Sequence, residues 1–279
     1  MEENYVYKKE VDWSLLIEGL ALPVENQVVF GKIMGRFLRR GERKSITIVL
    51  NGKSYTASIL NLNLDKKWNT KDKYQIRYLR NGDLANALQH CFSGSFNYLK
   101  HMRDIRDPGD RRIIRLPEDE KEYLVIYSTE YDDTYIFDPI VKNDLFTAQK
   151  YFFQMSERMF ENQLLSDSVD RNASLEEKMQ IAKIRKLDRS IGNNLKLLYG
   201  YRCQICGGLI GEEYSAHVVE AHHIDYFVKS LNNDASNQLI VCPNHHRIIH
   251  EVNPVFDRRT KVFTYNNGKK QGLMLNEHL

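Results

Sequence analysis

Two pairs of metal-binding residues, each with a two-residue gap, constrain the last third of this 279-residue chain more than any other feature. The first pair is Cys203 and Cys206, followed by glycine, and the second is Cys242 and His245. Two residues between thiols let both sulfurs point inward from one tight turn, and a glycine suits the backbone of that turn. Together the pairs predict a tetrahedral Cys3His zinc site. Its role is structural, because a closed four-ligand site has no open position for a substrate.

Three histidines lie within nine residues in the stretch "CPNHHRIIH". With about 3.6 residues per helical turn, His246 and His250 share one face of a helix. His245 is rotated by about 100° from His246 and points elsewhere. The stretch therefore predicts two separate tasks, one for His245 at the zinc and another for His246 with His250.

The sequence from the first pair to the end of this stretch predicts a strand, a loop, a second strand and a helix. "VVEAHHI" and "NQLIVC" are typical of short strands, a polar loop joins them, and a helix begins at the proline of "PNHHRIIH". The segment from about 199 to 250 resembles the HNH endonucleases, which share the ββα-metal fold with McrA-type restriction enzymes and colicin nucleases. The residues that carry the resemblance are Glu220, His222, His223, Asn237, Cys242, His245, His246 and His250.

The resemblance implies a role for each residue at a matching position. His223 is the general base that takes a proton from water, as a neutral imidazole with a pKa near about 6.5 can do. Asn237 braces the loop and helps to orient His223. His222 and His246 hold one divalent cation, magnesium or manganese, that polarises the scissile phosphate. His250 either completes this metal site or contacts phosphate.

Two positions depart from the family pattern. Many members have a carboxylate at position 222 and a cysteine at position 245. Imidazole ligands suit manganese better than magnesium. The histidine at position 222 therefore predicts that manganese supports activity at least as well as magnesium does. The histidine at 245 preserves zinc binding but leaves His217 and His246 open as alternative fourth ligands. For Glu220, the sequence favours an exposed strand position over a salt bridge to an active-site arginine.

The chain as a whole predicts an α+β fold in three parts. Residues 1–140 have the pattern of a β-rich, barrel-like domain, with a hairpin at Asn51-Gly52. Residues 141–198 read as a helical connector, in which Ser174 and Glu177 predict a capping box. Residues 199–279 form the HNH domain with its zinc. The β-rich domain is the candidate for DNA recognition, and four of its aromatic residues could stack on a flipped base or simply belong to core or surface: Tyr55, Trp68, Tyr74 and Tyr78.

Composition limits the cellular setting. The net charge of +3 permits nucleic-acid binding without arguing for it. No apolar run approaches the roughly 20 residues of a membrane span, and charged residues near the N-terminus argue against an export signal. Few cysteines, three of them clustered, favour a metal site in a reducing compartment. We therefore expect a cytoplasmic protein without membrane contact.

These patterns predict a metal-dependent endonuclease that hydrolyses double-stranded DNA, of the restriction type. A homodimer is expected because each HNH site cuts one strand, with the helical stretch 142–165 as a candidate surface. The alternatives are a nuclease that depends on DNA modification and an inactive, zinc-stabilised DNA-binding protein. Candidate phosphate contacts, each of which could equally be a solvated charge, are Arg39, Arg40, Arg247, Arg258 and Arg259.

Overall fold

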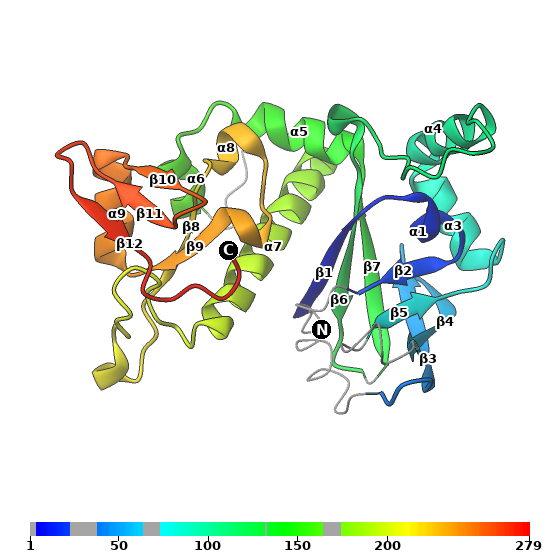
Figure 1. Cartoon of the computed structure of the whole chain (residues 1–279), viewed down its shortest axis with the longest axis horizontal. Helices are drawn as coiled ribbons and strands as arrows, with labels where there is room; N and C mark the ends of the chain where they lie inside the picture. The colour runs from blue at the N-terminus through cyan, green and yellow to red at the C-terminus, as the bar shows by residue number, and fades with distance from the viewer. Residues whose placement is uncertain (1–3, 23–37, 64–72, 132, 164–173) are drawn as a thin grey trace. The chain divides into compact units, whose positions relative to one another are not determined.

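The computed structural model describes the chain except for residues 1–3, 23–37, 64–72, 132 and 164–173. It divides into two compact units, Met1–Lys142 and Asn143–Leu279, and the fold is mixed α+β (Figure 1). The helices of segment 143–198 belong to the second unit, together with the four residues expected to bind zinc. Among the helices that can be described, none has the length and apolar character needed to cross a membrane.

The first unit is built on one curled seven-stranded sheet in the order β1-β6-β7-β3-β4-β5-β2 (Figure 1). Neighbours pair antiparallel except β3 and β7, which are parallel. Three helices add apolar side chains to the core of the sheet. The elements are β1 (Asn4–Glu10), α1 (Trp13–Ile17), β2 (Gly19–Ala21), β3 (Arg43–Leu50), β4 (Lys53–Asn61), β5 (Tyr74–Arg77), α3 (Asp83–Cys91), α4 (Ser93–Asp104), η1 (Glu118–Glu120), β6 (Tyr123–Ser128) and β7 (Thr134–Ile140).

The predicted hairpin at Asn51-Gly52 is confirmed. Both residues have positive φ, 49° and 75°, as a two-residue hairpin turn requires, and β3 and β4 pair along their full length. Side chains alternate along β3, so that Ile46 and Ile48 are buried while Ser45 is exposed. This period of two explains why one face of the sheet forms the core and the other carries polar groups.

The aromatic residues considered for base stacking have other positions in this unit. Tyr74 and Tyr78 are buried, and their hydroxyls donate to the backbone carbonyls of Leu38 and Leu15. Tyr55 is half-buried against the core, and Trp68 lies outside the described residues. Of the basic run at 31–44, the described Arg39 is exposed and Arg40 half-buried, next to the turn before β3.

The second unit combines helices with two small antiparallel sheets. The predicted capping box of α7 is confirmed, since the Ser174 hydroxyl accepts from the Glu177 amide and the Glu177 carboxylate accepts from the Ser174 amide. The elements are α5 (Lys142–Phe152), α6 (Glu157–Gln163), α7 (Leu175–Leu198), η2 (Glu212–Tyr214), β8 (Glu220–His223), α8 (Phe227–Ser230), η3 (Ala235–Asn237), β9 (Gln238–Val241), α9 (Pro243–Val252), β10 (Val255–Asp257), β11 (Val262–Thr264) and β12 (Lys270–Gly272).

The ribbon formed by β8 and β9 lies between α7 and α9 (Figure 1). Helix α7 approaches one face so closely that a Cβ on Gly192 would lie 3.0 Å from the Cβ of Ala221. The other face packs against Ile249 of α9 through Leu239 and Val241. Because strand side chains alternate, consecutive residues of β8 point to different helices.

Candidate active site and metal centre

The four residues expected to bind zinc lie together in the second unit. Cys203, Cys206, Cys242 and His245 each offer a ligand atom, and these atoms lie within 4.8 Å of one another. The Nδ1 atom of His245 is 3.2 Å from the sulfur of Cys242 and 3.6 Å from that of Cys203. Three sulfurs and one imidazole nitrogen at such separations are the donor set of a tetrahedral zinc site.

Local backbone geometry explains this cluster. The Gly207 amide donates to the Cys203 carbonyl at 2.7 Å, and Gly207 has φ of +68°, which favours glycine. On the other side, α9 begins with Pro243 directly after Cys242, and this start directs His245 back toward the thiols. His217, one of the alternative ligands, stacks on Tyr201 instead and lies outside the cluster.

Burial of the Cys203 thiol favours a bound cation at this cluster. In the absence of metal, burial raises the pKa of the Cys203 thiol to about 11. A thiolate forms there at neutral pH only if a positive ion compensates for the lost hydration. Metal binding to this cluster is therefore coupled to proton release and to folding of the surrounding unit.

A second cluster joins the other histidines and one carboxylate. Glu161, His222, His246 and His250 offer ligand atoms within 4.8 Å of one another. The Nε2 atoms of His246 and His250 lie 2.9 and 2.5 Å from Oε2 of Glu161 and 3.1 Å from each other. Two lone pairs so close to one another require a shared proton or a cation between them. The donors, three imidazoles and one carboxylate, suit a divalent transition metal.

The charges of this second cluster follow from its neighbours. Burial lowers the pKa of His222, so this imidazole is available as a neutral ligand. Burial also opposes protonation of His246, but the carboxylates of Glu161 and Glu220 raise its pKa to about 9. Burial by itself raises the pKa of Glu161, whereas its histidine partners hold it well below the usual range. The cluster is thus an ionised carboxylate among imidazoles.

Glu220 has a specific role in this arrangement, which its sequence position did not predict. Its carboxylate accepts a hydrogen bond from Nδ1 of His246. A carboxylate on the nitrogen that faces away from the cluster fixes the tautomer of His246 and leaves Nε2 for a metal. Glu220 is therefore an outer partner of the cluster rather than an isolated surface residue.

His223 lies on the opposite face of β8, between two carboxylates. Its Nε2 atom is hydrogen-bonded to Oδ1 of Asp188 at 2.8 Å, and its Nδ1 atom lies 2.9 Å from Oε1 of Glu157. Burial disfavours the charged ring, but the carboxylates of Asp188 and Glu157 raise the pKa of His223 to about 10. In this arrangement His223 is an imidazolium, which differs from the neutral, water-facing base expected from the sequence.

We expect His223 to stay protonated at alkaline pH in zinc-loaded protein without a second metal. Its folded pKa of about 10 exceeds the ordinary value of 6.5, so its stabilising contribution is complete below pH 6.5 and is lost as pH rises through about 10. Ring-nitrogen chemical shifts measured by NMR between pH 6 and pH 9 test this. A ring that loses its proton near pH 6.5 contradicts the ion pairs described here.

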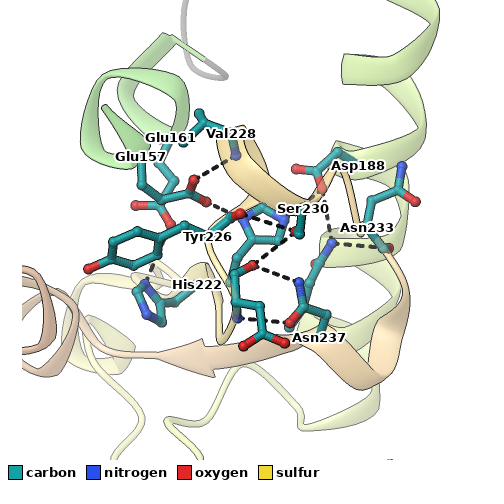
Figure 2. A network of polar contacts seen from close by, with 12 residues as sticks. Glu157, Glu161, Asp188, His222, Tyr226, Val228, Ser230, Asn233 and Asn237 are labelled. Atoms are coloured by element: carbon teal, nitrogen blue, oxygen red, sulfur yellow. Dashed lines mark hydrogen bonds and ion pairs between the residues drawn. The ribbon is translucent and has the colours of Figure 1, made fainter. Parts of the chain in front are cut away.

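Asn237 braces the loop that follows β8 (Figure 2). Its side-chain oxygen accepts from the Asp225 amide at 2.9 Å, and its nitrogen donates to the carbonyls of Asp225 and Asn232 at 2.9 and 2.7 Å. Arg258 donates to the same side-chain oxygen at 2.7 Å and pairs with Asp225. Arg258 thus supports the loop in this structure, while Arg247 and Arg259 are exposed.

Three acidic residues at the site were not identified from the sequence. Glu157 and Glu161 lie on α6, four residues apart and so on one helical face, and this spacing is the signal that could have indicated them. Asp188 is buried in the middle of α7, within a stretch rich in lysine and arginine. No motif surrounds Asp188, so only the packing of α7 against the ribbon places it at His223.

No protein-family model matches this chain, and no similar curated protein or solved structure was found. The geometry of the two clusters and the chemistry of their residues are therefore the basis for a functional proposal.

Proposed function

We propose that this protein is a metal-dependent endonuclease of the HNH type that hydrolyses phosphodiester bonds of double-stranded DNA, as a restriction enzyme does. One observation carries the proposal: imidazoles from β8 and α9 converge on one point, while the neighbouring residue of β8, His223, is held by a carboxylate. A metal site beside a histidine that a carboxylate orients is a pairing suited to phosphodiester hydrolysis.

In this proposal His222, His246 and His250 hold one divalent cation, manganese or magnesium. When bound, the cation supplies Lewis-acid stabilisation of charge on the phosphate. The Nε2 atoms of His246 and His250 are directed by their places one turn apart on α9, and Glu220 fixes the ring of His246. Because nitrogen donors predominate, we expect manganese to support at least as much activity as magnesium.

His223 is the proposed general base, and Asp188 is the residue that positions it. Asp188 accepts from Nε2 of His223, which fixes the tautomer and leaves Nδ1 to take a proton from water. Gln238 also donates to Asp188, at 3.1 Å, and so holds the carboxylate in place. In the present arrangement Glu157 lies at Nδ1, so proton transfer requires that Glu157 first moves away.

Replacing Asp188 with asparagine is expected to lower kcat by about 10²-fold, with little change in KM, because the ring of His223 loses its orientation and part of its basicity. The pH dependence of kcat should also shift to lower pH, an effect that a purely structural role does not produce. Glu176→Gln, an exposed change on the same helix, is the matched control. Equal pH profiles for wild type and Asp188→Asn contradict this role.

A plasmid cleavage assay tests the proposed function as a whole. Wild type and His223→Ala are compared on supercoiled DNA with and without cytosine methylation, in manganese and in magnesium. Discrete fragments that disappear in the variant support a site-specific nuclease, and dependence on methylation selects a modification-dependent enzyme. No cleavage of either substrate by folded, metal-loaded protein favours the alternative of an inactive, zinc-stabilised DNA-binding protein.

Target choice and assembly are further parts of the proposal. The first unit is the proposed recognition domain, with Arg39 and Arg40 as phosphate contacts, and Arg247 and Arg259 serve the same purpose near the site. A homodimer is proposed because a double-strand break needs two such sites. Sedimentation of the protein with and without a DNA duplex tests the assembly.

A further inference from the structure

The proposed general base and one proposed ligand of the cation are closed off from solvent. His222 and His223 are each 1 % exposed, and the Glu161 side chain is 6 % exposed. A phosphate of duplex DNA cannot reach side chains this deeply covered. Something within the second unit must therefore move before the proposed reaction can begin.

Helix α6 provides the cover, and it does so with two carboxylates. Oε2 of Glu161 lies 2.9 Å from Nε2 of His246 and 2.5 Å from Nε2 of His250, and Oε1 lies 3.4 Å from Nδ1 of His222. With a cation bound by these imidazoles, a carboxylate oxygen there would take the place that an oxygen of the substrate phosphate requires. Both are hard, anionic oxygen donors, so each can stand in for the other.

The second carboxylate of α6 lies at the proposed base. Oε1 of Glu157 is 2.9 Å from Nδ1 of His223, where a nucleophilic water has to be. Its other oxygen accepts from the amide of Val228 at 3.0 Å (Figure 2). Because Glu157 and Glu161 are one helical turn apart, a single displacement of α6 removes both.

We infer that α6 is an autoinhibitory plug, in which Glu161 takes the position of the scissile phosphate and Glu157 that of the attacking water. The inference rests on the proposed function and adds a regulated state to it. DNA binding, or a signal from elsewhere in the protein, must withdraw α6 before cleavage.

Apolar packing also holds the closed arrangement. Phe160 of α6 is fully buried, with ring centroids 4.9 Å from Phe152 and 4.6 Å from Phe227. In contrast, four buried atoms at the plug have no well-directed hydrogen bond among the described residues, namely Glu157 Oε1, Glu161 Oε1, His222 Nδ1 and His223 Nδ1. These atoms lie in pairs, at 2.9 Å between Glu157 and His223 and 3.4 Å between Glu161 and His222, and the aromatic anchor adds to the stability of the closed arrangement.

The negative charges of α6 also oppose the binding of a phosphate in the closed arrangement. Glu161 lies at the imidazoles that would hold the cation and Glu157 lies at His223, and two carboxylates at these places repel a phosphate. Withdrawal of α6 removes both carboxylates and exposes the histidines. The same movement therefore frees the two substrate positions and removes the repulsion.

Two variants test the plug in different ways. Glu157→Gln/Glu161→Gln removes both charges, whereas Phe160→Ala weakens the anchor without changing any group that faces the metal. We expect both to cleave plasmid DNA at least 10-fold faster than wild type, with manganese affinity, measured by calorimetry, within a few-fold of wild type. Hydrogen–deuterium exchange of α6 amides should rise in both. Arg158→Gln, an exposed change on α6, should match wild type in every measurement.

The outcomes separate the inference from the function on which it rests. If the double glutamine variant loses manganese binding and cleavage while Phe160→Ala cuts at the wild-type rate, Glu161 is an essential ligand and the plug is refuted. If wild type, the double glutamine variant and Phe160→Ala cleave at the same rate and the exchange of α6 amides is unchanged, the plug is refuted but the nuclease proposal is not. If α6 exchanges faster in both variants and manganese binds, yet no protein cuts, the nuclease proposal fails.

Discussion

Replacing His246 with alanine is expected to lower the rate of DNA cleavage by on the order of 10³-fold, the largest effect on activity that we predict. His246 lies within 3.1 Å of His250 and 2.9 Å of Glu161, so its loss opens the proposed coordination sphere on the α9 side. Lewis-acid stabilisation contributes several kcal/mol, and each 1.36 kcal/mol corresponds to about tenfold in rate. Initial rates at saturating manganese measure the effect.

His217→Ala is the matched control for this experiment. His217 is an exposed histidine of the same unit, stacks on Tyr201, and belongs to neither metal cluster. We expect it to keep wild-type activity and both metals. His246→Ala should retain zinc, because the proposed zinc ligand His245 lies on another face of α9. A His246→Ala protein that cuts at the wild-type rate eliminates this cluster as the catalytic centre.

Replacing Cys242 with serine is expected to have the largest effect on stability. Cys242 is 3 % exposed and belongs to the apolar cluster that packs α9 against the β8–β9 ribbon. Structural zinc contributes roughly 10 kcal/mol or more of binding free energy to small folds, so the loss of one ligand should destabilise the second unit by at least about 3 kcal/mol. Scanning calorimetry and the zinc content of purified protein measure this.

Cys91→Ser is the matched control, because Cys91 lies in the first unit and receives a hydrogen bond from Asn51. It should leave zinc content and the unfolding of the second unit unchanged. A Cys242→Ser protein that retains one zinc with wild-type affinity and an unchanged transition rules out the Cys3His assignment. Chelation of wild-type protein should reproduce the destabilisation of the variant.

Short-range patterns predicted the local structure well. The Asn51-Gly52 turn and the Ser174–Glu177 capping box depend on residues adjacent in sequence, and both are present. The two-residue gap between Cys203 and Cys206 likewise brings both thiols together within a single turn, as predicted. The predicted order of strand, loop, strand and helix is also present, since β8, a connecting segment, β9 and α9 follow one another along the chain, and β9 is a short, fully buried run.

Long-range packing supplied what these patterns could not. Glu161 lies 61 residues before His222, and no local rule joins α6 to β8. Asp188 and His223 meet only because Gly192 lets α7 approach the ribbon closely. The state of His223 also depends on two distant carboxylates, so the neutral ring expected from its ordinary pKa did not anticipate the imidazolium. Tyr78 points inward for the same reason, since its partner, Leu15, is 63 residues away.

The alternation of side chains along β8 determines which kinds of sequence change the site tolerates. The plane of the ribbon keeps two adjacent histidines apart, with His222 facing α9 and His223 facing Asp188 on α7. A shift of one residue in the pairing of β8 with β9 exchanges the two rings and leaves the composition unchanged. Single insertions or deletions in the loop that joins these strands should thus be far less tolerated than substitutions there. A change in loop length can shift the strand pairing by one residue and so move each histidine to the other face of the ribbon, whereas a substitution leaves the pairing unchanged.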